Sequence, residues 1–192
     1  MPSVVPITHR RFFHYRSVLD ATRLEAILQP GDIIFGMALD AGATQLIRGY
    51  QARWGYPERA ASATHVAIWT DAGTLLHSMA GRGCVEEAAS YLVGRTIAIG
   101  RWDHPNKSVN VDAILAVARA SLGRPYEMGS LFNQSLKNQP GWDEPFICST
   151  FVNSAFRTVM RQASPLHHGG LERKTPYVCP AHLFIQPGLS DP

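Results

Sequence analysis

Residues 145–152, Pro-Phe-Ile-Cys-Ser-Thr-Phe-Val, decide the fold of this chain. Downstream of Cys148, apolar side chains recur at the spacing of one helix face. They are Phe151, Val152, Ala155, Phe156 and Val159. Ser149 and Thr150 are residue types that cap helix N-termini. The pattern therefore predicts a helix that begins close to Cys148.

A cysteine at the start of a helix is a candidate nucleophile. The positive end of the helix dipole favours an anion, and the thiolate is the reactive form of cysteine. A free thiol with a pKa of about 8.5 is mostly protonated at neutral pH, so this placement matters. The alternative is a structural role, because free cysteines are often buried as small apolar residues. The segment alone favours neither interpretation of Cys148.

The composition is that of one globular domain. The chain has 192 residues, of which 45% are hydrophobic and 17% charged, so it can build a core and is not expected to be disordered. The formal net charge is +3, and no dense block of Lys and Arg occurs. This mild basicity suits an anionic partner but gives no indication of nucleic-acid binding.

Targeting signals are absent from the pattern. No apolar run of about 18 residues occurs, so no transmembrane helix is expected. Residues 1–11 lack the charged-then-apolar pattern of a secretory signal. We therefore expect a cytoplasmic protein, with export by a non-classical or effector secretion route as the alternative.

The chain has three cysteines, Cys84, Cys148 and Cys179. An odd count without paired spacing argues against a disulfide framework. No C-x-x-C or H-E-x-x-H spacing is present, so we expect no metal site and no cofactor. Cys84 and Cys179 are interpreted as structural.

A predicted β-hairpin carries two of the histidines. Alternating residues predict paired strands at 63–70 and 74–79, joined by an Asp-Ala-Gly turn. His65 lies near the start of the first strand and His77 near the end of the second. Pairing about residue 71 places them opposite one another, with Cβ atoms ~5 Å apart. The spacing therefore predicts that the two imidazoles are neighbours.

The remaining elements follow from periodicity and from turn residues. Helices are expected at 17–28, 40–53 and 111–122, strands at 33–36 and 96–102, and loops at 54–62 and 127–144. In the helix at 40–53, Leu46 is expected to face inward.

A thiol nucleophile needs a base within hydrogen-bond reach and a group that orients that base. His65 is the favoured base because it lies at a strand edge with a polar neighbour one strand away. His77 would bond the second ring nitrogen of His65 and fix its tautomer. A structural histidine pair is the alternative, and the presence of Cys148 favours the catalytic interpretation.

Two motifs carry a family resemblance. Residues 122–126 (Leu-Gly-Arg-Pro-Tyr) and 146–152 (Phe-Ile-Cys-Ser-Thr-Phe-Val) resemble the G-x-P-Y and C-S-x-[LF]-V signature of the NlpC/P60 papain-like cysteine peptidases. In ordinary members the strand with the histidine follows the cysteine, whereas Thr-His-Val-Ala-Ile at 64–68 precedes it here. This order, opened by Gly-Asp-Ile-Ile-Phe at 31–35, resembles the circularly permuted branch of YiiX-like and lecithin:retinol acyltransferase-like proteins.

The resemblance implies an α+β fold of the permuted papain-like type, in which an antiparallel sheet packs against helices and the nucleophile starts a helix. The catalytic domain would span residues 30–192, after an N-terminal arm and helix at 1–29. Residues 175–183 are similar to the T-P-x-D-L segment that closes YiiX-like proteins, with an insertion and with His182 in place of Asp.

By the same resemblance Cys148 is the nucleophile, His65 the base and His77 the third polar residue. Tyr126 matches a tyrosine whose hydroxyl lies near the nucleophile. Together with Ser149 at the helix start, it is assigned to the oxyanion or the substrate. The alternative for Tyr126 is an aromatic residue of the core.

The expected activity is that of a thiol amidase or endopeptidase on short peptides, with peptidoglycan stem peptides as the implied substrate. Arg124, Glu127 or Asp143 could read the charged ends of such a peptide. The alternative is lipid chemistry with the same three residues, as an acyltransferase, thioesterase or phospholipase, which the His-His-Cys set favours. A third interpretation is a non-catalytic binding module. The sequence does not fix the oligomeric state.

Overall fold

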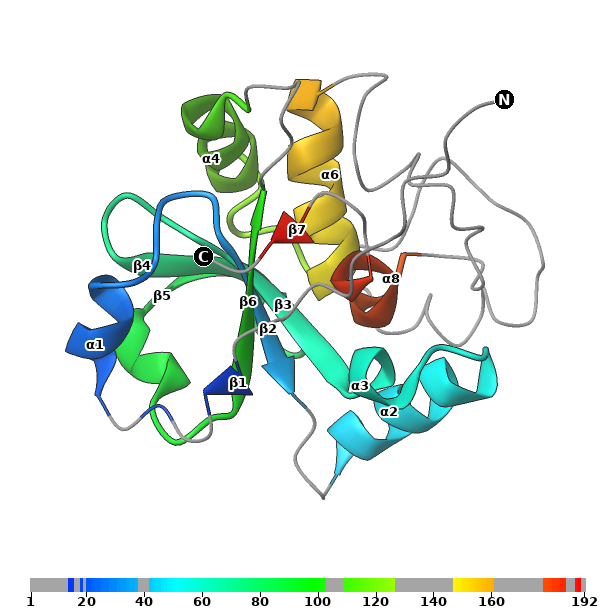
Figure 1. Cartoon of the computed structure of the whole chain (residues 1–192). Coiled ribbons are helices and arrows are strands. Elements are labelled where there is room, and N and C mark those ends of the chain that lie inside the picture. Colours follow the sequence, from blue (N-terminus) through cyan, green and yellow to red (C-terminus); the bar gives the residue numbers. More distant parts are fainter. Residues whose placement is uncertain are drawn as a thin grey trace, which may run out of the picture.

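Strands with alternating apolar residues build an antiparallel sheet, around which the rest of the chain is arranged (Figure 1). The computed structural model describes residues 14–15, 18, 20–37, 42–102, 109–126, 147–160, 178–185 and 189–190. The strands are β1 (His14–Tyr15), β2 (Ile33–Met37), β3 (Ala63–Trp69), β4 (Thr74–Met79), β5 (Gly83–Ala88), β6 (Ile97–Trp102) and β7 (Leu189–Ser190). Their order is β1-β6-β2-β3-β4-β5, with β7 paired to β6, and every pairing is antiparallel. The fold is therefore α+β with an antiparallel sheet, as the sequence predicted.

Helices cover the sheet and connect its strands. They are α1 (Ala21–Glu25), α2 (Ala43–Arg53), α3 (Glu58–Ala61), the 3-10 helix η1 (Ala89–Leu92), α4 (Val111–Arg119), α6 (Cys148–Met160) and α8 (Pro180–Phe184). Figure 1 shows α4, α6 and α8 grouped on one side of the sheet and α1 on the other. The helix predicted to begin near Cys148 begins at that residue.

The sheet separates two apolar cores, because successive side chains of a strand point to opposite faces. We call the side packed against α4, α6 and α8 the α6 face; its strand residues include Ile33, Phe35, Val66, Ile68 and Leu76. We call the other side the η1 face; its residues include Val18, Leu24, Leu28, Ile34, Ala67, Leu75 and Leu92. Both α1 and the 3-10 helix therefore pack against the η1 face of the sheet.

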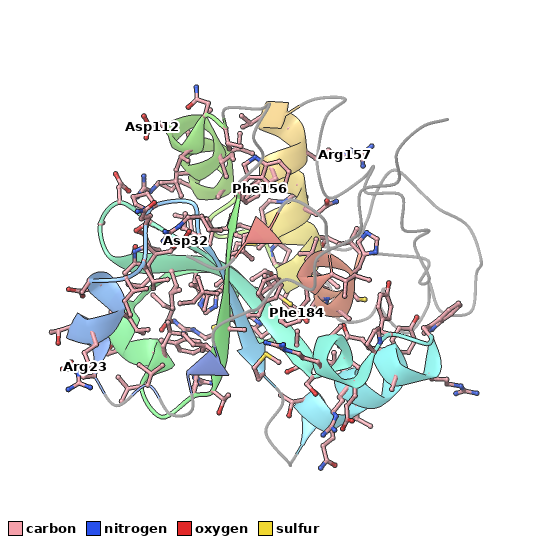
Figure 2. The ribbon with its side chains drawn as sticks, in the orientation of Figure 1. Arg23, Asp32, Asp112, Phe156, Arg157 and Phe184 are labelled. Atoms are coloured by element: carbon pink, nitrogen blue, oxygen red, sulfur yellow. The ribbon has the colours of Figure 1, made fainter. Side chains whose placement is uncertain are left out.

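The apolar stripe of α6 explains how that helix docks. Phe151, Val152 and Phe156 are almost completely buried. Figure 2 shows Phe156 on the α4 side of α6, whereas Arg23 and Asp112 point away from the sheet. At the start of α6 the hydroxyl of Thr150 accepts a hydrogen bond from the N–H of Ile147 at 3.0 Å, which fixes the entry of the chain into the helix.

The Gly-Asp motif before β2 has a structural explanation. The carboxylate of Asp32 is 1% exposed and receives two hydrogen bonds from the guanidinium of Arg101 on β6, at 2.8 and 2.7 Å. It also accepts the N–H of Gln29 at 2.8 Å. Two parallel bonds to a carboxylate are the strong geometry for arginine, so this pair ties the start of β2 to the neighbouring strand.

Three local expectations are wrong. The helix expected at 17–28 is confined to α1, which begins after Asp20 accepts the N–H of Thr22 at 2.9 Å. The expected loop at 54–62 contains α3. Leu46 is 73% exposed. The inward face of α2 is set instead by Gln51, which lies about 140° further around the helix.

Gln51 is a buried polar anchor. Its amide nitrogen donates to the carbonyls of Ala61 and Ala63 at 2.8 Å, and its oxygen accepts the N–H of Ala181 at 2.8 Å. The side chain therefore joins α2 to β3 and α8. A pattern of apolar spacing does not reveal such a residue, because a polar side chain is buried only when distant backbone groups satisfy it.

The hairpin register differs from the predicted one. Ile68 pairs with Leu76, and Trp69 pairs with Leu75. The turn is wider than expected, since the N–H of Thr70 donates to the carbonyl of Thr74. Continued along the strands, this register makes the two predicted histidines diagonal rather than direct neighbours, still on one face of the sheet.

Candidate active site

Cys148 is the first residue of α6 and is 5% exposed. The backbone N–H groups of Val66, Ser149 and Cys148 itself favour the charged form of its thiol. Two of these groups belong to the helix start, and the third belongs to β3. The sulfur therefore lies between the N-terminus of α6 and the strand that carries His65.

Burial nevertheless controls the thiol. Desolvation raises the pKa of Cys148 to about 11, because a thiolate loses its hydration in the core. The three backbone N–H groups oppose this effect without overcoming it. Contrary to the expectation from its place at the helix N-terminus, Cys148 is therefore not an acidic thiol, because burial outweighs the helix.

The two histidines of the hairpin are hydrogen-bonded. Nε2 of His65 lies 2.9 Å from Nδ1 of His77, and the ring centroids are 5.1 Å apart. Gly36 lies opposite His65 in the sheet, and a Cβ there would come within 3.2 Å of the His65 Cβ. The small residue on β2 therefore leaves room for the imidazole.

Both imidazoles are neutral in the folded protein. Burial, then the charge of His77 and then that of Arg95, lower the pKa of His65 to about 3. Burial, then Arg82 and then Arg95, lower the pKa of His77 to about 4. A protonated thiol and a neutral imidazole are thus the resting forms, and a preformed thiolate–imidazolium pair is not favoured.

His77 has an unusual environment. It is completely buried, and its Nε2 has no hydrogen-bond partner in the part of the chain that the structure describes. The ring instead meets Tyr91 of η1, with centroids 5.0 Å apart and planes at 81°. Tyr91 is a residue that the sequence analysis missed, because no motif singles out an aromatic residue at that position.

The thiol and the histidines approach from opposite faces of the sheet. Cys148 belongs to the core on the α6 face, whereas His65 lies with Ile34 and Ala67 on the η1 face. Among the described residues, no hydrogen bond joins Cys148 to either imidazole. Among the described residues, the structure therefore brings the two histidines together but does not bring Cys148 within hydrogen-bond reach of either.

The pairing of β3 with β4 is confined to two positions next to their turn. Val66, whose N–H favours the Cys148 thiolate, directly follows His65 in β3. Burial raises the pKa of Tyr91, which contacts His77, and a negative charge on Cys148 adds to that rise. The sulfur therefore lies close to the strand that carries His65.

Tyr126 lies near the thiol as well. It packs against the core on the α6 face, and burial together with the charge of Cys148 raises its pKa. The preceding turn is held on β5, where the N–H of Cys84 donates to the Arg124 carbonyl at 2.9 Å. Gly83 has a φ of +76°, and a Cβ there would collide with that carbonyl oxygen. The glycine thus allows the approach that positions Tyr126.

The other sequence candidates have different surroundings. The hydroxyl of Ser149 donates to the Val178 carbonyl at 2.7 Å and is buried, so only its backbone N–H faces the thiol. His182 is buried beside Tyr56, with 3.5 Å between Nδ1 and the hydroxyl oxygen. Glu127 and Asp143 lie outside the described residues. The three cysteines are all free.

A pocket opens beside His65 on the η1 face, with a volume of about 60 Å³. Its lining is mainly apolar, with three threonines and one arginine. The lining residues are Ile34, Gly36, Met37, Thr44, Thr64, His65, Ala67, Tyr91, Leu92, Arg95 and Thr96. One candidate base therefore faces a space that a small group can enter.

The described residues hold neither a candidate metal cluster nor a helix that could span a membrane. No cluster of three or more His, Cys, Asp or Glu side chains within the described ranges is placed to hold a metal ion. None of the described helices combines the length and apolar character needed to cross a bilayer. Neither a scan against protein-family models nor a search of curated proteins finds a match for this chain. The function must therefore be argued from the residues and their geometry.

Proposed function

We propose that this protein is a thiol hydrolase that cleaves an amide bond, on a permuted papain-like fold of the NlpC/P60 type. Cys148 is the nucleophile, His65 the base and His77 the residue that orients the base. The observation that supports this proposal is the 2.9 Å hydrogen bond between His65 and His77, because His65 precedes Val66, whose backbone N–H favours the charged form of the Cys148 thiol. The order of strand before helix is that of the permuted branch.

The path of the proton follows from the resting protonation states of Cys148 and His65. Because the thiol is protonated, His65 acts as a general base during attack, not as one half of an ion pair. This role requires the His65 ring to come within hydrogen-bond reach of the sulfur when substrate binds, since the two lie on opposite faces of the sheet. Sulfur then bonds to the carbonyl carbon while its proton passes to His65, and the departing amine takes that proton. Water hydrolyses the resulting thioester. The N–H groups at the start of α6, with Tyr126 nearby, stabilise the oxyanion.

The histidine bond sets the tautomers. For Nδ1 of His65 to accept the thiol proton, its Nε2 must carry a hydrogen and donate it to Nδ1 of His77. The hydrogen of neutral His77 then lies on Nε2, the nitrogen without a conventional partner, beside the Tyr91 ring. An aromatic ring is a weak acceptor for an N–H, so this arrangement is tolerated.

The proposed substrates are short peptides, with peptidoglycan stem peptides first. Lipid acyl chemistry is the second candidate, because the third catalytic position is a histidine. Both candidates use the same thioester step and differ in the carbonyl compound that is attacked.

The test compares purified muropeptides with phosphatidylcholine vesicles. We expect the full chain to cleave an amide in the muropeptides, and Cys148→Ala and His65→Ala to be inactive. Cys179→Ala is the matched cysteine control and retains activity, since Cys179 is a buried cysteine that forms no disulfide and lies outside the proposed triad. Release of fatty acid alone would replace the amidase proposal with the lipid one. Activity that survives Cys148→Ala would overturn both.

A further inference from the structure

Arg95 is a cation held in a fixed position at the pocket beside His65. It lies in the connection between η1 and β6 and lines the pocket. Its guanidinium carbon sits 4.1 Å from the centroid of the Tyr91 ring, and its Nε donates to the Tyr91 carbonyl at 2.8 Å. Stacking and one hydrogen bond therefore fix the plane of the side chain.

Arg95 is exposed, and no carboxylate of the described residues forms an ion pair with it. Four other arginines of the described ranges form ion pairs with carboxylates: Arg48, Arg82, Arg101 and Arg119. Arg95 makes none within those ranges, and neither terminal nitrogen has a hydrogen-bond partner there. An arginine fork that is fixed but unpaired suits a planar anion, which it can bind through two parallel hydrogen bonds.

The rest of the pocket limits what can accompany the anion. Ile34, Met37 and Leu92 give apolar walls, while Thr64 already donates its hydroxyl to the Gly36 carbonyl. The pocket has a volume of about 60 Å³ and suits one small side chain with a carboxylate.

We propose that this pocket binds the free carboxylate of a short peptide, with Arg95 on the carboxylate and the apolar walls around the side chain of the terminal residue. The proposal rests on the proposed amidase function and names its substrate class: short peptides with a free C-terminal carboxylate. The occupant is a carboxylate and not a phosphate, because the apolar walls around His65 suit a carbon chain attached directly to a small planar anion.

Binding there would also adjust the base. Arg95 and His77 are the charged or titratable groups that lower the pKa of His65, and Arg82 and Arg95 do so for His77. A carboxylate on Arg95 offsets one of these positive charges. The pKa of both imidazoles should therefore rise when the ligand binds, which makes His65 a better proton acceptor.

The experiment is an NMR titration of the full chain, carried out in the Cys148→Ala variant so that nothing is turned over. The probes are N-acetylalanine, its neutral amide N-acetylalaninamide, and inorganic phosphate. We expect saturable shifts of the His65 and His77 ring signals, and a raised pKa for both, with N-acetylalanine alone. Equal binding of the amide, or preferential binding of phosphate, would overturn the proposal.

Variants locate the anion. Arg95→Gln should weaken binding of N-acetylalanine by about 10- to 100-fold, the usual loss for a hydrogen bond to a charged group. Arg95→Lys, which keeps the charge but loses the fork, should recover part of that loss. Arg53→Gln is the matched control. Arg53 is the last residue of α2, whereas Thr44 near the start of that helix lines the pocket, so this variant should bind N-acetylalanine normally. Unchanged binding in Arg95→Gln would contradict the assignment.

The two proposals fail separately. The acid and amide probes are compared on a chain with Arg95 intact, so a folding defect in a variant does not blur the result. A chain that binds N-acetylalanine but cleaves no amide retains the pocket and loses the proposed enzyme. A chain that cleaves peptides with free and amidated ends at equal rates retains the enzyme and loses the pocket.

Discussion

At the scale of single residues, the thiol of Cys148 shows that position on a helix and solvation act in opposite directions. The backbone N–H groups at the helix start stabilise a thiolate, but a side chain that is 5% exposed loses more by desolvation. The result is a protonated nucleophile that depends on a neighbouring base. This distinguishes the site from those in which the thiolate exists before the substrate arrives.

Alkylation by iodoacetamide tests this state. We expect Cys148 to react slowly at neutral pH and to reach half-maximal reactivity near pH 11, well above the ~8.5 of a free thiol. The extent of labelling is read from the peptide that contains residue 148 by mass spectrometry, with Cys148→Ser as the blank. An apparent pKa below that of free cysteine would show a preformed ion pair instead.

The orienting role of His77 makes a second prediction. His77→Ala should lower kcat/KM for the muropeptide by at least about tenfold, because His65 loses the bond that fixes its tautomer. Alkylation of Cys148 should persist. His182→Asn is the comparison, since it alters another buried histidine, bonded to Tyr56, away from the pair. A rate unchanged by His77→Ala would remove that residue from the site.

Nitrogen NMR tests the tautomers directly. At pH 7 we expect His65 to carry its ring hydrogen on Nε2. We expect His77 to carry its ring hydrogen on its own Nε2, beside Tyr91. Tyr91→Phe keeps the ring and should keep both tautomers, whereas Tyr91→Leu removes the acceptor face and should mix them. A hydrogen on Nδ1 of His65 would be incompatible with its use as the base.

At the scale of elements, glycines decide how closely segments approach the hairpin. Gly83 has positive φ and lies against the turn that leads to Tyr126. Gly81, two residues earlier, also has positive φ, at +78°, but a Cβ there would meet nothing within 4 Å. Comparing substitutions at Gly81 and Gly83 therefore separates the free-energy cost of positive φ from that of a steric clash.

Gly81→Ala should cost about 1 kcal/mol of folding free energy, the usual penalty for a side chain at positive φ. Gly83→Ala should cost more, about 2–4 kcal/mol, because the Arg124 segment must also move. Urea unfolding measures both, and activity should fall only in Gly83→Ala, as Tyr126 shifts. Equal losses of stability would show that the contact with Arg124 is unimportant.

At the scale of the whole molecule, one sheet carries a core on each face, and the candidate site lies where both cores reach the hairpin. The nucleophile comes from the helix on the α6 face, and the histidines lie on the η1 face. Holding two imidazoles neutral, with His77 buried and His65 half-buried, has a consequence for the stability of the entire fold.

We expect stability to fall as the pH decreases below about 6.5. The unfolded chain protonates both histidines near that pH, whereas the folded protein keeps them neutral until about pH 4 for His77 and pH 3 for His65. Protons therefore favour the unfolded state throughout this window. The free energy of unfolding should drop by about 2 kcal/mol or more between pH 7 and pH 5. Urea titrations at the two pH values should show a smaller fall in the free energy of unfolding for His77→Gln. An identical fall would mean that other groups cause the pH dependence.

Much of the fold could be predicted because its signals are local. Alternation predicted β3 and β4, and the apolar spacing after Cys148 predicted α6, since strand and helix periodicity are written within a few residues. The contact between His65 and His77 was predictable for the same reason, although the wider turn makes it diagonal.

The sequence by itself thus determined the hairpin, the helix that begins at Cys148 and the meeting of two histidines, and its motifs implied the α+β class. Only the tertiary structure decided the protonation of Cys148, the part played by Tyr91 and Arg95 around the histidines, and the burial of Gln51. The physical reason is that solvation and electrostatic fields depend on groups brought together from distant parts of the chain. Periodicity predicts on which face of a helix or strand a side chain lies. It does not predict how much water or charge surrounds that side chain once the chain has folded.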